Sequence, residues 1–250
     1  MIKMLQGWVR NGDIRIHYLD NTGTSEKETP LVIIPGLTEA DDDYEEMIQE
    51  LLPRRTIVIT LRGRGQSDAP KEGYTLEDHV SDIEAVINNI IIDHFILFGY
   101  SRGVSYALAY AIENRGRVKG LIIGDYPAVH TNLRPGWADF FTGLPDWKGK
   151  SVLERVNKET LERIEAESEE IHFKEQLKKL DCPFLIIRGG LDGAALTEEG
   201  VRDYMDAVPN ARVRVFEKAD HNLFTPDSGQ MVHTFQEFFQ EIDQRDKQSQ

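Results

Sequence analysis

One stretch of the chain constrains its fold more than any other. Residues 96–98 are apolar, and they lead directly into Gly99-Tyr100-Ser101-Arg102-Gly103. Residues 104–111 then carry helix-forming side chains at helical spacing. A serine between two glycines at such a junction predicts a sharp turn, because a Cβ at Gly99 or Gly103 would collide with the neighbouring strand or helix. We therefore expect a buried strand, a tight turn and a helix, with Ser101 exposed at the apex as a nucleophile.

Strand and helix patterns alternate along most of the chain. An Asn11-Gly12 turn joins two short strands between residues 7 and 18, which is a strong hairpin signal. Apolar strands are then predicted at 31–34, 56–60, 118–123, 184–187 and 213–216, and helices at 44–52, 76–91, 197–207 and 230–242. This alternation predicts an α/β fold with a mostly parallel central sheet and helices on both faces.

The connection between Ile123 and Phe184 is much longer than the others. Connections of this length are often lids or binding segments, so residues 127–182, here called the cap segment, are predicted to form a small cap. Four aromatic side chains in it are candidates for substrate binding: Trp137, Phe140, Phe141 and Trp147. The rest of residues 1–250 is expected to form one domain with this cap, and the polar residues 244–250 to form a frayed tail.

Composition excludes several classes of protein. The chain has 250 residues, of which 40% are hydrophobic, and a formal net charge of −14, with no basic stripe for nucleic acid or an acidic membrane surface. The N-terminus lacks the apolar core of a signal peptide, and no apolar run approaches membrane-spanning length. The single cysteine excludes an internal disulfide. We expect a cytoplasmic monomer or homodimer acting on a small molecule.

Three motifs together resemble the α/β-hydrolase superfamily. Residues 99–103 look like its nucleophile elbow, Arg188-Gly189-Gly190-Leu191-Asp192 like its acid turn, and residues 219–224, which contain His221, like its histidine loop. Their order along the chain is that of the family, and the resemblance extends from about Gly7 to Ile242. It implies the α/β-hydrolase fold, with an esterase-like serine site.

A serine nucleophile needs a base and an acid. His221 is the expected base, because it follows a predicted strand in a loop, where sites of open α/β sheets gather. A carboxylate must then fix its tautomer. Asp192 is preferred as this acid because the acid turn matches its position. Asp125, which follows the strand ending at Ile123, is the alternative, since some members of the superfamily place the acid there.

The backbone N–H groups of Leu37 and Arg102 are the expected oxyanion donors. By resemblance, Leu37 lies in the loop after strand 31–34, where the family usually carries His-Gly-x and this chain has Pro35-Gly36. Arg102 is unusual beside the serine. Its guanidinium could bind a substrate carboxylate, or it could pair with Asp125 or Asp192.

The resemblance implies a serine hydrolase that cleaves a carboxylic ester or related acyl compound through an acyl-enzyme on Ser101. Two alternatives stay open: an enzyme that cleaves carbon–carbon bonds or eliminates a group from a keto or dicarboxylic acid, and a ligand sensor with slow turnover. The sequence contains no metal-binding constellation and no nucleotide fingerprint, so neither a metal nor a cofactor is expected.

Overall fold

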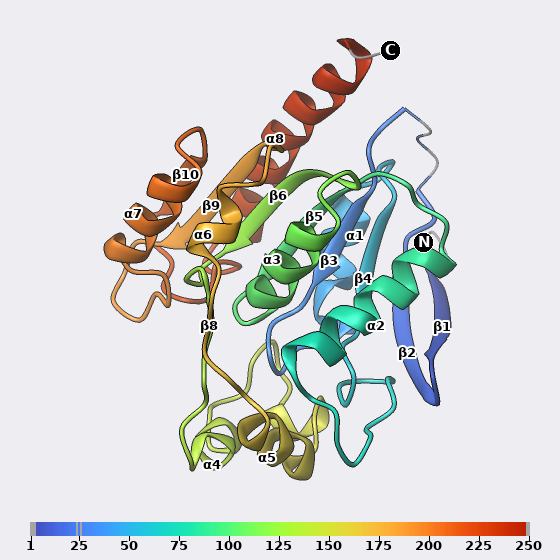
Figure 1. Ribbon diagram of the computed structural model, residues 1–250, viewed down its shortest axis with the longest axis vertical. Coiled ribbons are helices and arrows are strands. Elements are labelled where there is room, and N and C mark those ends of the chain that lie inside the picture. The colour runs from blue at the N-terminus through green and yellow to red at the C-terminus, as the bar shows by residue number, and fades with distance from the viewer. Residues whose placement is uncertain (1–3, 24, 26, 249–250) are drawn as a thin grey trace.

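An eight-stranded sheet forms the centre of the molecule. The computed structural model describes residues 4–23, 25 and 27–248, and Figure 1 shows their arrangement. The strands run in the order β1-β2-β4-β3-β5-β6-β9-β10. Their bounds are β1 Leu5–Asn11, β2 Ile14–Asp20, β3 Leu31–Ile34, β4 Thr56–Ile59, β5 Phe95–Tyr100, β6 Val118–Gly124, β9 Phe184–Gly189 and β10 Arg212–Phe216.

The hairpin lies at one edge of the sheet. Strand β1 pairs with β2 in antiparallel register up to Asn11 opposite Ile14, and Gly12 in the turn has a φ of +61°, which suits glycine. Strand β2 pairs antiparallel with β4, whereas the six strands β4, β3, β5, β6, β9 and β10 are parallel to one another. The prediction of a mostly parallel sheet is confirmed.

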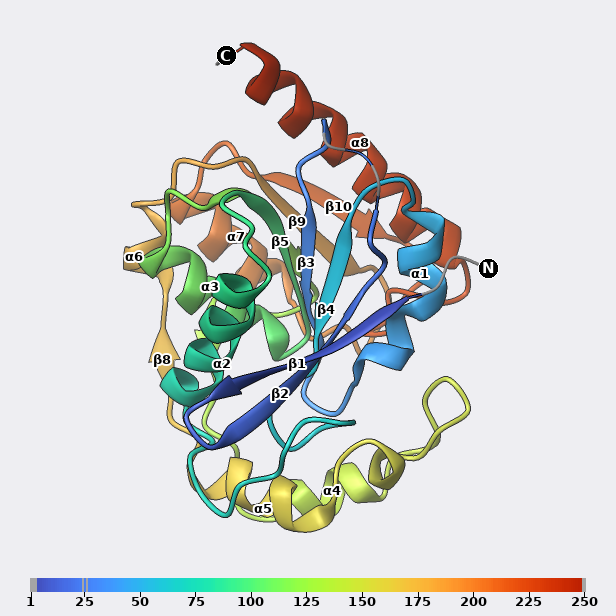
Figure 2. The ribbon, with the colours of Figure 1, turned by 90° about the vertical axis from the view of Figure 1, so that its right-hand side faces the viewer.

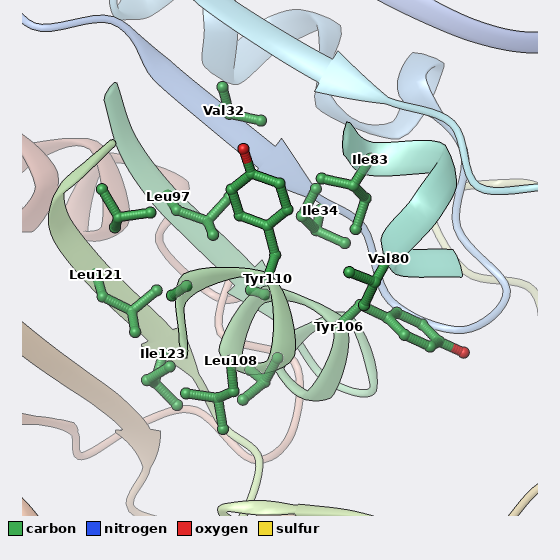
Figure 3. Close-up of a cluster of buried hydrophobic side chains, with 14 of the residues drawn as sticks. Val32, Ile34, Val80, Ile83, Leu97, Tyr106, Leu108, Tyr110, Leu121 and Ile123 are labelled. Atoms are coloured by element: carbon green, nitrogen blue, oxygen red, sulfur yellow. The ribbon is translucent and has the colours of Figure 1, made fainter. Parts of the chain in front are cut away.

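Helices cover both faces of the sheet (Figure 2). They are α1 Glu45–Glu50, α2 Leu76–Asn89, α3 Gly103–Glu113, α7 Glu198–Ala207 and α8 Ser228–Gln248, with the 3₁₀ turn η1 Asp41–Tyr44 before α1. Side chains of α2, α3 and α7 share one apolar core, and those of α1 and α8 share the other. In Figure 3, Ile123 of β6 lies beside Leu108 of α3, and Leu97 of β5 belongs to the same first core. Helix α2 starts with a capping box, in which Thr75 and Asp78 each bond to the other's backbone N–H.

The cap segment divides into short elements, which are β7 Val129–His130, α4 Trp137–Thr142, η2 Val152–Glu154, α5 Lys158–Ala166, β8 Ile171–His172 and α6 Lys174–Leu177. Helices α4 and α5 lie together at one end of the molecule (Figures 1 and 2). An ion pair between Arg155 Nη2 and Asp43 Oδ1, at 2.5 Å and almost fully buried, joins this segment to η1. The cap segment is therefore anchored to the loop that follows β3.

The C-terminal helix is longer than predicted. Helix α8 continues to Gln248, so the expectation of a frayed tail from 244 is wrong for residues 244–248, and 249–250 lie outside the described residues. Met231, Phe235, Phe238 and Ile242 form the buried stripe that anchors this helix. None of the helices in the described part of the chain is long and apolar enough to cross a membrane.

Candidate active site

Ser101 lies in a strained turn that directly follows strand β5. Ser101 has a φ of +51°, in the left-handed region that side chains seldom adopt. The two flanking glycines leave no room for a Cβ: one on Gly99 would lie 2.7 Å from Val104 Cα, and one on Gly103 2.3 Å from the carbonyl oxygen of Pro35. The predicted sharp turn is confirmed, and the close approach of backbone to backbone explains both glycines.

His221 lies against Ser101. Its Nε2 is 2.9 Å from Ser101 Oγ, within hydrogen-bond distance. The loop after β10 carries His221, and Tyr100 fixes this loop by donating its hydroxyl to the His221 carbonyl at 2.6 Å. The Tyr100 and His221 rings also stack, with centroids 5.4 Å apart and an interplanar angle of 17°. The structure therefore brings together the serine and the histidine that the sequence singled out.

Asp125, not Asp192, holds the other side of the imidazole. Its Oδ2 is 2.8 Å from His221 Nδ1, and its side chain is fully buried. Three backbone N–H groups also donate to this carboxylate: Gly189 at 3.2 Å, Ala195 at 2.7 Å and Leu196 at 3.3 Å. The preference for Asp192 is wrong in this structure, and the alternative acid occupies the position.

The order of the strands explains this correction. Strand β6 lies directly beside β5, and Ser101 N–H donates to the carbonyl of Gly124 at 2.8 Å, which places Asp125 next to the serine. Strand β9 lies one position further away, and its following turn carries Asp192 into solvent. That turn supplies backbone amides to Asp125 instead of its own aspartate.

The loop after β3 and the elbow after β5 each supply one backbone amide beside Ser101, that of Leu37 and that of Arg102. Among the described residues, neither Leu37 N–H nor Arg102 N–H donates to another group of the protein. Arg64, which is fully buried, donates from Nε to the Leu37 carbonyl at 2.8 Å and so fixes the orientation of that peptide. Two free amides beside a nucleophile can bind an oxyanion. Their use in this way stays a prediction.

The Arg102 guanidinium points away from this site. It is 2% exposed and donates to the carbonyl and hydroxyl of Thr131, and to His130 Nε2 at 2.9 Å. Because arginine can only donate, His130 must be neutral with its hydrogen on Nδ1, 2.8 Å from Ser105 Oγ. Burial, followed by the charge of Arg102, lowers the pKa of His130 to about 3. The guanidinium therefore pairs with neither Asp125 nor Asp192, and Arg102 does not line the pocket at Ser101.

A pocket of about 320 Å³ opens above the serine. It is lined by Ser101, His221, Leu37 and Tyr100 from the body, and by Phe141, Leu144, Pro145, Trp147 and Val152 from the cap segment. Phe141 and Trp147 thus line the pocket as predicted. Trp137 stacks on Phe141 behind the wall, with centroids 3.5 Å apart, and Phe140 is 61% exposed outside it. Neither of these two lines the pocket.

Three acidic side chains that the sequence did not single out also line this pocket: Glu39, Asp146 and Asp220. Burial, the largest effect, raises the pKa of Glu39. Asp146 and Asp220 are exposed at the rim. In the part of the chain that the structure describes, no three His, Cys, Asp or Glu side chains gather in a way that could hold a metal ion.

Comparison with known proteins identifies the fold family. Residues 29–179 match the model of the family described as the alpha/beta hydrolase fold. The chain belongs to the α/β-hydrolase fold family. This match includes β3, the elbow and Asp125, whereas His221 lies beyond it.

Curated relatives of this α/β hydrolase match only part of its length. The AB hydrolase superfamily protein YisY of Bacillus subtilis (strain 168) is 34% identical over 111 residues, which are 43% of this chain and 41% of that protein. The soluble epoxide hydrolase of Corynebacterium sp. (strain C12) is 26% identical over 154 residues, 57% of this chain and 52% of that protein. The chain thus spans about half the length of these relatives.

Solved structures match almost the whole chain at low identity. An esterase from Exiguobacterium antarcticum has a TM-score of 0.78 at 20% identity, covering 94% of this chain and 100% of that one. E-2-(acetamidomethylene)succinate hydrolase has a TM-score of 0.76 at 18% identity, covering 95% and 100%. At such identities these similarities establish the fold alone.

Proposed function

We propose that this protein is a serine hydrolase that cleaves a neutral carboxylic ester or a related acyl compound through an acyl-enzyme on Ser101. One observation carries the proposal: the continuous hydrogen-bonded chain from Ser101 Oγ through the His221 ring to Asp125, at 2.9 and 2.8 Å. Ser101 and His221, at one end of this series of hydrogen bonds, line the pocket. This series is the arrangement that acyl transfer to a serine requires.

The acylation step uses all three hydrogen-bonded side chains. Ser101 Oγ attacks the substrate carbonyl carbon while His221 Nε2 accepts the hydroxyl proton, and buried Asp125 stabilises the imidazolium that forms. The Leu37 and Arg102 amides bind the negative oxygen of the tetrahedral intermediate. As the intermediate collapses, the bond to the leaving group breaks, and His221 returns the proton to that group. The acyl group then remains as an ester on Ser101.

Water completes the reaction. His221, neutral again, accepts a proton from a water molecule, whose oxygen attacks the acyl carbon. The second tetrahedral intermediate uses the same two amides, and its collapse releases the carboxylic acid while His221 returns the proton to Ser101 Oγ. No cofactor takes part in this sequence of steps.

The pocket supports an uncharged, partly apolar substrate. Its wall is built largely from apolar side chains, and its ionisable groups other than His221 are all acidic. The expectation of a substrate carboxylate was based on Arg102, whose guanidinium is buried behind the elbow. An anionic substrate would face Asp146 and Asp220 at the rim, and none of the described residues that line the pocket is a lysine or arginine. This charge distribution disfavours keto-acid and dicarboxylate substrates.

Covalent labelling tests the proposal. A fluorophosphonate probe is expected to modify Ser101, identified by peptide mass spectrometry, and p-nitrophenyl butyrate to be hydrolysed with an initial burst of nitrophenol. Ser101→Ala is expected to abolish both signals, while Ser151→Ala, outside this pocket, retains them. Folded wild-type protein that is neither labelled nor active would refute the proposal and favour a ligand sensor.

A further inference from the structure

Tyr100 lies between the first glycine of the elbow and Ser101, and it contacts the histidine loop at three points. Its hydroxyl donates to the His221 carbonyl oxygen at 2.6 Å. Its ring stacks on the His221 ring, with centroids 5.4 Å apart and an interplanar angle of 17°, and meets the Phe224 ring edge to face at 5.2 Å. One side chain at the end of β5 therefore holds both the backbone and the ring of His221.

His221 depends on its neighbours for its orientation. Its side chain is 37% exposed, and it belongs to the loop of residues 217–227 that joins β10 to α8. The hydrogen bond to Asp125 fixes one ring nitrogen, but it leaves the ring able to rock about that contact. Such a rotation carries Nε2 away from Ser101 Oγ, and a misplacement of about 1 Å can lower a rate about a hundredfold. The Tyr100 ring lies against one face of the imidazole and opposes this rotation.

Tyr100 is itself fixed by the sheet. It is 3% exposed and lies opposite Gly124 in the register of β5 and β6. A Cβ on Gly124 would be 3.0 Å from Tyr100 Cδ2, so the missing side chain leaves the room that the ring occupies. Burial, followed by the charge of Glu39, raises the pKa of Tyr100 well above its ordinary value, so the hydroxyl keeps the hydrogen that it donates. A rigid strand residue thus orients a residue on a loop.

The stacked ring also interacts with the charge that the reaction creates. His221 becomes an imidazolium whenever it takes a proton from Ser101 or from water. A cation over the face of an aromatic ring, within about 6 Å of the ring centroid, is attracted by the π electrons, and the His221 ring centroid lies 5.4 Å from that of Tyr100. Neutral imidazole gains less from this contact. The interaction is therefore stronger in the transition state than in the ground state.

We propose that Tyr100 is a positioning residue for the reaction: it holds His221 Nε2 at Ser101 Oγ, and its ring stabilises the imidazolium. This inference rests on the proposed function. Both contributions act on proton transfer, which occurs in acylation and again in release of the acyl group. Tyr100 also lines the pocket, so a role in substrate binding alone is the competing explanation. The two explanations differ in whether kcat or KM changes when Tyr100 is replaced.

Two variants separate the hydroxyl from the ring. Tyr100→Phe keeps the stacked ring and loses the hydrogen bond to the His221 carbonyl, so kcat for p-nitrophenyl butyrate is expected to fall about two- to tenfold. Tyr100→Leu loses both contacts and is expected to lower kcat about ten- to hundredfold. KM should stay within about twofold in both variants, because substrate binding does not require the proton transfer. A higher KM at unchanged kcat would overturn the inference.

A transition-state analogue gives a second measurement. Trifluoromethyl propyl ketone is expected to add to Ser101: the serine oxygen bonds to the carbonyl carbon, and the proton moves to His221, so the adduct contains the imidazolium. Its inhibition constant should rise by about the same factor as kcat falls in each variant. Methyl propyl ketone is not activated for addition and should bind all three proteins equally. Equal inhibition of the three proteins by the trifluoromethyl compound would contradict the inference.

Two buried tyrosines outside this pocket serve as matched controls. Tyr74→Phe removes a hydroxyl that donates to the Pro70 carbonyl at 2.9 Å, and Tyr110→Leu truncates a fully buried ring. Both should lower stability in urea and leave kcat within about twofold. If these controls lose as much kcat as the Tyr100 variants, general loosening of the fold explains the loss and the inference fails. Should Tyr100→Leu not fold, Tyr100→Phe and its control Tyr74→Phe decide the question.

Failure of the inference and failure of the proposed function give different results. Normal fluorophosphonate labelling of wild-type Ser101, together with unchanged kcat and unchanged trifluoromethyl ketone inhibition in the Tyr100 variants, would overturn this inference alone. Folded wild-type protein that is not labelled would overturn the proposed function, and this inference with it.

Discussion

Replacing Asp125 by asparagine tests which acid serves His221. The carboxylate of Asp125 accepts four hydrogen bonds: His221 and Ala195 donate to Oδ2, and Gly189 and Leu196 to Oδ1. An asparagine side chain has one acceptor oxygen and one NH₂ group. Whichever way it is turned, its NH₂ group faces donors. The substitution therefore changes the charge and the hydrogen bonding of this side chain while its shape stays nearly the same.

Each orientation of the amide predicts a loss of activity. With NH₂ toward His221, Nδ1 must become an acceptor, so Nε2 carries the hydrogen and cannot take the Ser101 proton. A wrong tautomer of this kind lowers kcat by about 10⁴-fold, or about 5.5 kcal/mol of transition-state stabilisation. With NH₂ toward Gly189 and Leu196, two buried donors lose their acceptor, at about 1–3 kcal/mol of folding stability each, and the imidazolium loses its anionic partner.

The assay compares two matched variants. Steady-state hydrolysis of p-nitrophenyl butyrate and the rate of fluorophosphonate labelling are measured for Asp125→Asn and Asp192→Asn, and urea unfolding reports the stability of each. We expect kcat/KM to fall by about 10³-fold or more in Asp125→Asn. Asp192 is exposed, so Asp192→Asn should stay within about twofold. A comparable loss in Asp192→Asn, or activity above one tenth in Asp125→Asn, would refute the assignment.

Three further predictions concern packing, specificity and pH. Gly103→Ala places a Cβ 2.3 Å from the Pro35 carbonyl oxygen, so calorimetry should give a lower Tm and a free energy of unfolding that is smaller by about 1–3 kcal/mol. Gly116 is exposed with open space around it, so Gly116→Ala should leave Tm within about 2 °C of the wild-type value. Trp147→Ala enlarges the pocket and should lower kcat/KM for p-nitrophenyl butyrate about tenfold, and Phe140→Ala, which is outside the pocket, should not. His130 has a pKa of about 3 in the folded chain, against 6.5 as its ordinary value. Between these two pH values only the unfolded chain binds the proton. The contribution of neutral His130 to folding stability is therefore complete above pH 6.5 and is lost as pH falls toward 3, by about 1.4 kcal/mol per pH unit. Urea unfolding at pH 7 and pH 5 should show a smaller decrease in His130→Gln than in wild type, and equal decreases would contradict the prediction.

Local patterns were sufficient for the secondary structure and for part of the site. The strand at 31–34 was predicted to the residue because four apolar side chains follow a polar loop and end at Pro35. Ser101 was found because its flanking glycines report a backbone conformation that other residues cannot adopt. His221 was found because its loop follows a strand. Each of these signals is contained in a few consecutive residues.

The role of Arg102 and the lining of the pocket depended on distant segments. Arg102 was expected near a substrate or an acid, but Thr131 and His130, almost thirty residues away, take its hydrogen bonds. Of the aromatic residues in the cap segment, the sequence could not show which would turn inward. That depends on how α4 packs against Leu37, where Trp137 and Phe141 gather.

Glu39 could have been noticed as an acid three residues after Gly36, within the loop expected to hold the oxyanion. Its sequence position gives no reason to expect burial, since an isolated glutamate is usually exposed. Only the folded loop, with Tyr44 and the Gly36 amide on one oxygen, gives the group its environment.

A mostly parallel α/β sheet and a strained serine between β5 and α3 follow from the amino-acid sequence alone, because periodicity and backbone strain are local properties. Which aspartate serves the histidine depends on the arrangement of the strands in the folded sheet. Asp125 and Asp192 both follow parallel strands, and each is a plausible acid when the chain is read in order. The sheet places β6 beside β5 and β9 beyond it, so Asp125 reaches His221, and the residues on both sides of Asp192 supply amide hydrogen bonds to Asp125. Distance between strands in the sheet, which no short sequence motif encodes, made that choice.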